Sequence, residues 1–320
     1  MIEKENILFD EYIDELSLLG PMNKNIQLIE KKLNTKIVVS RDSLVIDKKY
    51  KEEIINILEV MKTFMANNGS LKEKDVVSII NLLQHYSFDE VNNFFKETYT
   101  FISTYDGRLI NAKTINQKKY FLTLQHNDII FVKGSAGSGK TYLAVAYALN
   151  LLKKNKIKKI IITRPVVEAG EKLGFLPGDL KEKIDPYLRP IYDAIYDIIG
   201  IESANKFFEK EVIEIAPLAY MRGRTMDNAF IILDEAQNTT DGQMKMFLTR
   251  LGFNSKMVIT GDTSQTDLPS NVSSGLDRAC KMLHDLEGIG IVTLENIDVM
   301  RHPLVSEIIK VYEENTNDKK

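Results

Sequence analysis

The sequence of 320 residues has very few of the residues that build disulfide frameworks and metal centres. Its single cysteine, Cys280, excludes a disulfide within the chain, which is typical of proteins in a reducing compartment. Because Cys280 lies in an apolar run at 276–286 that predicts a helix, we expect a small buried core residue and not a nucleophile. The four histidines do not form a Cys/His cluster, so no metal site of that type is predicted.

Long apolar runs are absent as well. No stretch reaches the ~18 consecutive apolar residues of a membrane-spanning helix. The N-terminal segment, MIEKENILFDEYIDEL, is acidic and lacks the apolar centre of a signal peptide and the basic character of a transit peptide. We therefore expect a soluble, cytoplasmic protein without a membrane partner.

Charge of one sign is not in large excess. The formal net charge is −3, so no global positive field attracts nucleic acid, although a local basic patch is compatible with that value. Hydrophobic residues make up 44% of the chain and charged residues 27%, as in ordinary globular proteins. The length suits about two domains.

One stretch matches a phosphate-binding loop, G-x-x-x-x-G-K-[ST]. It lies between a predicted buried strand at 129–133 and a helix-forming run at 141–152, which is the context that this motif requires. The glycines let the backbone N–H groups point inward around anionic oxygens, and the helix N-terminus favours negative charge. A chance Gly/Ser-rich turn is the alternative, and the flanking elements argue against it. The predicted phosphate contacts come from Gly134, Ser135, Ala136, Gly137, Ser138, Gly139, Lys140 and Thr141.

Within this loop two side chains have distinct predicted roles. Lys140 is expected to reach the β- and γ-phosphates of a nucleotide, and Thr141 to hold Mg²⁺ through its hydroxyl.

Short apolar runs alternate with helical segments from residue 129 onward. Such runs predict strands of a parallel sheet that is covered on both faces. We therefore predict an α/β fold with a RecA-like P-loop NTPase core, whose active residues gather at the carboxyl ends of the strands. The runs are 129–133, 159–163, 212–216, 229–233, 256–260 and 290–294.

Asp234 and Glu235 follow the run at 229–233 directly, as in a Walker B motif. Asp234 is expected to hold Mg²⁺, and Glu235 to orient and deprotonate the attacking water. A carboxylate pair that only caps the next helix is the alternative, which the four preceding apolar residues and the upstream P-loop disfavour. The second acid favours hydrolysis over transfer of phosphate to an acceptor.

The run at 256–260 leads into a polar segment that contains Gln265. Its amide can hydrogen-bond both a terminal phosphate and a water molecule, so Gln265 is the candidate sensor. In the alternative, Asp262 and Thr263 only form a turn. An arginine is also expected near the phosphate, and a surface salt bridge is the alternative for each candidate. The preferred candidate is Arg301, and the others are Arg164, Arg222 and Arg224, of which the last two also suit a nucleic-acid backbone.

The N-terminal region predicts a compact α+β module in the order β–α–β–β–α. The first strand is expected near 12–19, helices at 26–33 and 49–66, and a hairpin at 35–47. A turn at Gly20–Asn23 opens the first helix, as in KH-type RNA-binding modules, although the fourth position is Asn23 where KH has glycine. A small interaction or oligomerisation domain is the alternative. The predicted domains are 1–70 (KH-like), 71–110 (helical connector), 111–315 (ATPase core) and 316–320 (frayed tail).

Five blocks together resemble the PhoH-like ATPases, whose core is similar to superfamily 1 helicases. The N-terminal LLGPMNKNIQLIEKKLNTKIVV also resembles the KH-like leader of the longer bacterial members. The blocks span most of 115–310 and read GSAGSGKTYLAVAYAL, TRPVVEAGEKLGFLPGDLKEKIDPYLRPIYDAI, IAPLAYMRGRTMDNAFIILDEAQNTT, MKMFLTRLGFNSKMVITGDTSQTDLP and VMRHPLV.

This resemblance implies Mg²⁺-dependent ATP hydrolysis linked to RNA. It places Gln117 at the adenine-reading glutamine and Gln265 at the helicase motif III glutamine. It also implies a homo-oligomeric ring in which an arginine reaches the neighbour's nucleotide, and an association with a metal-dependent endoribonuclease of ribosomal RNA maturation. A conventional superfamily 1 helicase has two such cores and this chain has one, so strand separation would need subunits acting together.

Two other functions remain open from the sequence. A nucleotide-switched adaptor would recruit a protein partner without direct RNA action, and the net charge of −3 is compatible with it. A small-molecule phosphotransferase would need an acceptor site, and none is identifiable.

Overall fold

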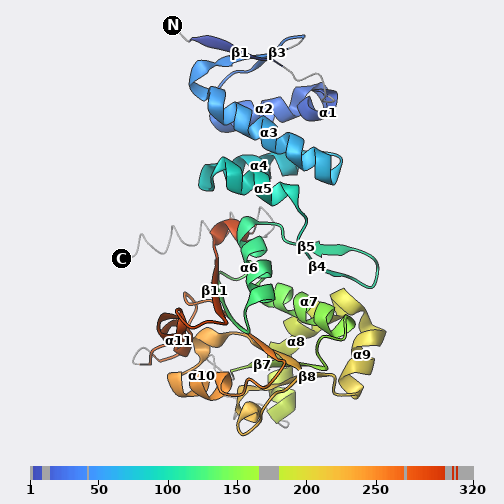
Figure 1. Cartoon of the computed structure of the whole chain (residues 1–320), viewed down its shortest axis with the longest axis vertical. Coiled ribbons are helices and arrows are strands. Elements are labelled where there is room, and N and C mark those ends of the chain that lie inside the picture. Colours follow the sequence, from blue (N-terminus) through green and yellow to red (C-terminus); the bar gives the residue numbers. More distant parts are fainter. Residues whose placement is uncertain are drawn as a thin grey trace. The chain divides into compact units, whose positions relative to one another are not determined.

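The computed structural model describes residues 3–8, 15–41, 43–165, 180–269 and 272–299, together with 305 and 308 (Figure 1). The chain forms two compact units, Met1–Thr98 and Tyr99–Lys320. The predicted connector at 71–110 is therefore wrong as a separate segment: its helices belong to the first unit, and the hairpin that follows belongs to the second. The predicted tail at 316–320 lies outside the described residues.

The first unit contains an antiparallel sheet with the strand order β1-β3-β2. Its strands are β1 (Lys4–Leu8), β2 (Val38–Val39) and β3 (Ser43–Asp47). The first strand expected near 12–19 is wrong, because Glu15–Leu19 forms helix α1. Leu18 and Leu19 are both buried, and a helix can bury two adjacent side chains whereas a half-buried strand hides alternate ones.

The helices of the first unit are α2 (Lys24–Leu33), α3 (Lys51–Asn68), α4 (Glu73–His85) and α5 (Phe88–Lys96). The predicted order β–α–β–β–α is present, with β1 as its first strand and α1 added. Helices α4 and α5 pack against α2 and α3. Lys24 pairs with Glu73 at 2.9 Å, and the rings of Phe64 and Phe95 meet edge to face with centroids 5.3 Å apart.

The second unit is built on a parallel six-stranded sheet with the order β11-β6-β10-β9-β7-β8. All six predicted strands and their parallel arrangement are confirmed. The strands are β6 (Ile129–Gly134), β7 (Lys159–Arg164), β8 (Ile213–Pro217), β9 (Ala229–Leu233), β10 (Lys256–Gly261) and β11 (Ile289–Leu294). A two-stranded antiparallel hairpin, β4 (Thr100–Ser103) and β5 (Leu109–Asn111), precedes the sheet along the chain.

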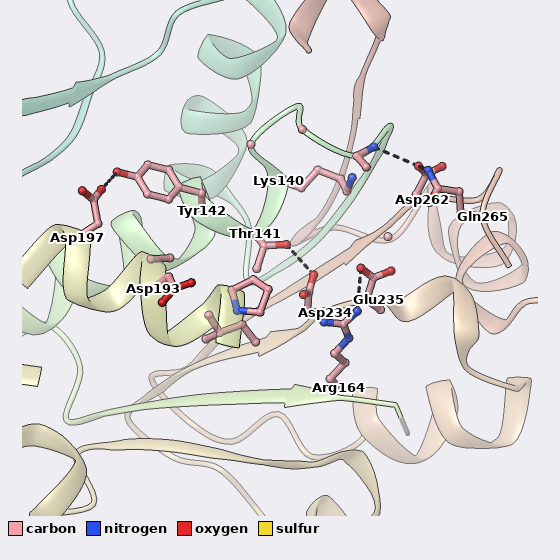
Figure 2. Close-up of a pocket in the computed structure, with 17 residues that line it drawn as sticks. Lys140, Thr141, Tyr142, Arg164, Asp193, Asp197, Asp234, Glu235, Asp262 and Gln265 are labelled. Carbon is pink, nitrogen blue, oxygen red and sulfur yellow. Dashed lines mark hydrogen bonds and ion pairs between the residues drawn. The ribbon is translucent and has the colours of Figure 1, made fainter. Parts of the chain in front are cut away.

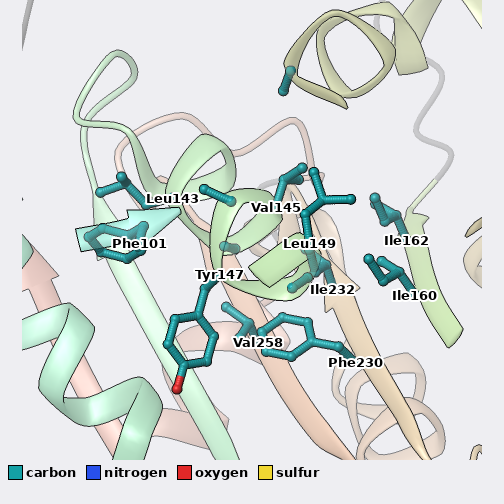
Figure 3. Close-up of a cluster of buried hydrophobic side chains, with 14 of the residues drawn as sticks. Phe101, Leu143, Val145, Tyr147, Leu149, Ile160, Ile162, Phe230, Ile232 and Val258 are labelled. Atoms are coloured by element: carbon teal, nitrogen blue, oxygen red, sulfur yellow. The ribbon is translucent and has the colours of Figure 1, made fainter. Parts of the chain in front are cut away.

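Helices cover both faces of this sheet. Successive strand residues point to opposite faces, so Ile160 and Ile162 join one buried cluster and Ile161 joins the other. Helices α7 and α8 pack on the first cluster (Figure 3), and α10 and α11 on the second. The helices of this unit are α6 (Ile115–His126), α7 (Lys140–Lys153), α8 (Leu180–Ile199), α9 (Ile201–Glu209), α10 (Asp241–Leu248) and α11 (Gly275–Leu283).

Cys280 lies on α11 inside the second cluster, which confirms the predicted core position. Burial raises the pKa of its thiol to about 11, so the thiol stays protonated near neutral pH.

The buried ring of Phe230 provides a direct test of this core. Phe230 is fully buried in β9 and its ring lies 6.0 Å from that of Tyr147 on α7 (Figure 3). We expect Phe230→Ala to lower the free energy of unfolding by about 3–5 kcal/mol, because the substitution leaves a cavity. The matched control is Phe253→Ala, at a side chain that is 86% exposed, with an expected change within about 0.5 kcal/mol. Urea unfolding measures both, and equal effects of the two substitutions would contradict the assignment of the core.

Candidate active site

A cavity of about 640 Å³ lies where the strands β6, β7, β9 and β10 end (Figure 2). Because the strands are parallel, their carboxyl ends meet at one edge of the sheet. Lys140 and Thr141 are the first residues of α7, directly after the loop that follows β6, Arg164 ends β7, and Glu235 follows β9. The cavity therefore brings together residues that are far apart in the sequence.

The loop after β6 requires its glycines. Gly134, Gly137 and Gly139 have φ values of 153°, 84° and 89°. A Cβ atom on Gly134 would lie 2.3 Å from the carbonyl oxygen of Leu294 in β11. Lys140 Nζ donates hydrogen bonds to the carbonyl oxygens of Gly134 and Ser135, at 2.6 and 3.0 Å. The loop thus holds a positive charge beside the backbone groups that the motif assigns to phosphate.

Asp234 lies against the start of α7. Its Oδ1 accepts hydrogen bonds from Thr141 Oγ1 at 2.6 Å and from Thr260 Oγ1 at 2.7 Å. The two residues predicted to share Mg²⁺ are therefore adjacent. Thr260 was not identified from the sequence, where its only signal is its place at the end of an apolar run.

This set of donors fits Mg²⁺. A hydroxyl and one carboxylate lie together, and Mg²⁺ in nucleotide sites uses one or two carboxylates together with substrate phosphates. No group of three or more His, Cys, Asp or Glu side chains suited to a metal occurs among the described residues.

Glu235 has an unusual backbone conformation, with φ 53° and ψ 38°. Such a left-handed conformation is strained for a residue other than glycine and is common at functional sites. Its side chain lines the cavity, and Oε1 lies 3.2 Å from Arg164 Nη2. The predicted base and one of the candidate arginines are thus in contact.

Gln237 joins the loop after β9 to the loop after β10, although the sequence did not single it out. Its Nε2 donates to Glu235 Oε2 and to the carbonyl oxygen of Gln265, and its Oε1 accepts from the backbone N–H of Asp262. The side chain of Gln237 is buried. The amide of Gln237 thus connects Glu235, the predicted base, to the loop that carries Gln265, the predicted sensor.

Gln265, the predicted phosphate sensor, is among the residues that line the cavity. Its Nε2 donates to Asp262 Oδ2 at 2.9 Å, and the same oxygen accepts from the backbone N–H of Ala136 in the P-loop at 3.2 Å. Asp262 also forms the alternative turn, because its Oδ1 accepts from Ser264 N and Oγ. The turn and the cavity-lining position of Gln265 are therefore compatible.

Gln117 lies on α6 and is buried against the P-loop. Its Nε2 donates to the carbonyl oxygen of Ser138 at 3.2 Å, and its Oε1 accepts from the N–H of Lys113 at 2.9 Å. Gln117 lines a second cavity of about 260 Å³. This cavity shares Gly137, Gly139 and Tyr142 with the first one.

The candidate arginines separate in the structure. Arg164 lies in the cavity, whereas Arg224 makes a two-point ion pair with Glu214 at 2.6 and 2.8 Å. This pairing raises the pKa of Arg224 and lowers that of Glu214, so the salt-bridge alternative holds for Arg224. Arg222 is exposed and does not line the cavity. Arg301 lies outside the described residues.

Tyr142, Asp197 and Arg108 form a polar group that the sequence did not indicate. Tyr142 Oη donates to Asp197 Oδ2 at 2.6 Å, and Arg108 Nη2 donates to both carboxylate oxygens, at 2.8 and 2.7 Å. The bonds from Tyr142 and Arg108 lower the pKa of Asp197. Burial and the bond to Asp197 raise the pKa of Tyr142 to about 12.

Comparisons with known proteins agree with these motifs. The family described as PhoH-like protein matches residues 109–313. A PhoH-like protein of Bacillus subtilis (strain 168) is 47% identical over 302 residues, covering 94% of each chain. Protein PhoH of Escherichia coli (strain K12) is 38% identical over 256 residues, covering 79% of this chain and 70% of that protein.

Two solved structures show only a distant likeness. The Pif1 helicase from Candida albicans is 16% identical with a TM-score of 0.30, covering 57% of this chain and 38% of its own. The Sulfolobus solfataricus SWI2/SNF2 ATPase core in complex with dsDNA is 18% identical with a TM-score of 0.31. The match covers 48% of this chain and 32% of that chain. The α/β fold is defined by the parallel six-stranded sheet described above. Among the described helices, none is long and apolar enough to cross a bilayer.

The close approach of Gly134 to Leu294 leads to a test of the loop. We expect Gly134→Ala to lower the free energy of unfolding by about 1–3 kcal/mol, because its Cβ must displace backbone atoms. The same displacement should weaken nucleotide binding. Gly242→Ala is the matched control, because a Cβ there meets no atom within 4 Å. Urea unfolding and equilibrium binding of ADP measure the two effects, and a Gly134→Ala protein with unchanged binding would contradict the assigned loop geometry.

Proposed function

Because the chain belongs to the PhoH-like protein family, we propose that it binds ATP with Mg²⁺ and hydrolyses it to ADP and phosphate. One observation carries the proposal. The carboxylate of Glu235 lines the same cavity as Lys140 and the Thr141–Asp234 pair. A site with a cation for phosphate, ligands for Mg²⁺ and a further acid has the groups that water attack on a terminal phosphate needs.

The triphosphate would bind along the loop after β6. The N–H groups of the loop and the start of α7 would contact phosphate oxygens, with Lys140 as the local cation. Thr141 and Asp234 would hold Mg²⁺, which neutralises charge on the β- and γ-phosphate oxygens. Thr260 helps to orient Asp234 by donating to the same carboxylate oxygen.

Glu235 would accept the proton of the attacking water. Arg164 and Gln237 each bind one of its carboxylate oxygens, so the side chain is held in one orientation within the cavity. Arg164 also adds a second cation near the position where charge develops during phosphoryl transfer. Gln265 would contact the terminal phosphate from the loop after β10.

The second cavity is the proposed site of the adenine base. It is lined by Leu109, Lys113 and Gln117 and opens next to the P-loop at Gly137 and Gly139. The amide of Gln117 has remaining donor and acceptor capacity beyond its bonds to Ser138 and Lys113.

Glu235→Gln tests the proposed base. We expect the substitution to slow ATP hydrolysis by ~10²–10⁴-fold while leaving the dissociation constant of ATP nearly unchanged, because the amide keeps the shape and loses the basicity. Lys140→Ala is the contrasting variant, which should weaken ATP binding because a cation on the phosphates is lost. Phosphate release and calorimetric ATP binding give the two readouts. Hydrolysis by Glu235→Gln at the wild-type rate would remove Glu235 from this role.

We further propose that ATP turnover is coupled to RNA, in a homo-oligomeric ring in which Arg301 reaches the nucleotide of a neighbouring subunit. Family membership motivates this part of the proposal, as does an aromatic side chain near an arginine after β8. Tyr220 is 57% exposed, and Arg222 is exposed two residues later. Aromatic rings and cations side by side suit single-stranded nucleic acid. An endoribonuclease of ribosomal RNA maturation is the proposed protein partner.

RNA dependence of the ATPase rate tests the coupling. We expect single-stranded RNA to raise the rate of phosphate release, and Tyr220→Ala to reduce RNA affinity by ~5–100-fold, since base stacking contributes about 1–3 kcal/mol. Phe253→Ala is the control, because it removes another exposed ring. If RNA neither binds nor changes the rate, and a protein partner instead binds in an ATP-dependent way, the chain acts as a nucleotide-switched adaptor.

A further inference from the structure

The first cavity, of about 640 Å³, has two chemically different ends (Figure 2). Glu235 and Gln265 lie toward one end, and Tyr142 and Asp197 lie toward the other. The terminal phosphate must reach the acid that activates water, so it belongs at the end with Glu235. The nucleoside part of the substrate must then point toward Tyr142 and Asp197.

Tyr142 also marks the boundary between the two cavities. Gly137, Gly139 and Tyr142 line both of them. A nucleotide with its phosphates in the first cavity and its base in the second has its sugar between them. With ATP bound as proposed, the sugar would lie beside Tyr142.

The partners of Tyr142 are placed on both sides of this boundary. Asp197 lines the first cavity and Arg108 lines the second, and the two are joined by hydrogen bonds of 2.8 and 2.7 Å. Their bonds orient the carboxylate, and Asp197 comes from α8, whose side chains Ile191, Ile195 and Ile198 are anchored in the core. Asp197 is thus an oriented acceptor next to the place where the sugar of bound ATP would lie.

A carboxylate is a poor neighbour for phosphate, because both groups are negative. A carboxylate is a good acceptor for hydroxyl groups, and the ribose of ATP has two free hydroxyls, at the 2′ and 3′ positions. Among the described residues, Oδ1 of Asp197 accepts a bond from Arg108 alone, so it has acceptor capacity left for a ligand. An aspartate is ionised at neutral pH, and the bonds from Tyr142 and Arg108 lower the pKa of Asp197 further, so it offers a charged acceptor, for which hydrogen bonds are strong.

We propose that Asp197 accepts hydrogen bonds from the ribose hydroxyls of the bound nucleotide, and that the site therefore selects ribonucleotides over deoxyribonucleotides. The inference rests on the proposed function, because the position of the sugar follows from ATP bound in this cavity. Arg108 and Tyr142 act as positioning residues that hold the carboxylate. A purely structural link between the β4–β5 hairpin and α8 would make the same bonds without any preference for the sugar.

The test compares the dissociation constants of ATP, 2′-deoxy-ATP and 3′-deoxy-ATP with Mg²⁺, measured by calorimetry on the full chain. We expect the wild type to bind ATP at least about tenfold more tightly than one or both deoxy analogues, the range of a hydrogen bond to a charged group. Asp197→Asn should reduce that ratio to below about threefold by weakening ATP binding and leaving the affinity of the deoxy analogue nearly unchanged.

Two further variants distinguish recognition of the ribose by Asp197 from a purely structural role of its carboxylate. Glu202→Gln makes the same chemical change at an exposed position on α9, outside both cavities, and should keep the wild-type ratio. Asp197→Glu keeps the charge and moves the oxygens, and should also lower the ratio. It serves as the test if thermal unfolding shows that Asp197→Asn is not folded.

Phosphate release, measured on the same samples, separates this inference from the proposed function. A preference for ribose that depends on Asp197, without phosphate release, would overturn hydrolysis and keep the assignment of Asp197. Equal affinities for the three nucleotides, or an Asp197→Asn protein that keeps the full preference, would overturn the assignment even if hydrolysis proceeds. Failure of all three nucleotides to bind would overturn both.

Discussion

The two hydrogen bonds that Asp234 accepts, from Thr141 and from Thr260, connect the start of α7 with the carboxyl ends of β9 and β10. Thr141 belongs to the helix after β6, Asp234 follows β9, and Thr260 lies in β10, which is paired between those two strands. The sheet order therefore brings a hydroxyl and a carboxylate into hydrogen-bond contact, at the place where the proposed function puts Mg²⁺. The other groups of the cavity are arranged around this contact.

A second constraint is the buried amide of Gln237. It binds Glu235, the backbone of Asp262 and the carbonyl of Gln265, so it links the loops after β9 and β10. A buried amide without partners is unfavourable, so these loops are stable in one relative arrangement. The left-handed backbone of Glu235 is retained at some cost in energy, which is consistent with a side chain that must face the cavity.

The first unit bears on the proposed role of RNA. Its antiparallel sheet and the turn before α2 retain the predicted α+β order, but two lysines of α2 are engaged by α4. Lys24 pairs with Glu73 at 2.9 Å, and Lys32 donates to Asn81 at 3.0 Å. The first contact reduces the positive charge that α2 offers to a phosphate backbone, and the second uses a donor of Lys32 within the unit. The exposed Tyr220 and Arg222 of the second unit are for this reason the better candidates for contact with RNA.

The sequence by itself determined the six parallel strands, the P-loop and the Asp234–Glu235 pair, because apolar periodicity and a strand–loop–helix motif are local properties. It did not determine the first strand, because adjacent and alternating apolar residues are hard to distinguish in a short segment. Among the candidate arginines that the structure describes, only the tertiary structure decided which one lies in the cavity, since Arg224 is paired with Glu214 and Arg164 with Glu235. The same holds for Arg108 and Asp197, which are 89 residues apart and meet only because α8 and the β4–β5 hairpin pack on one core.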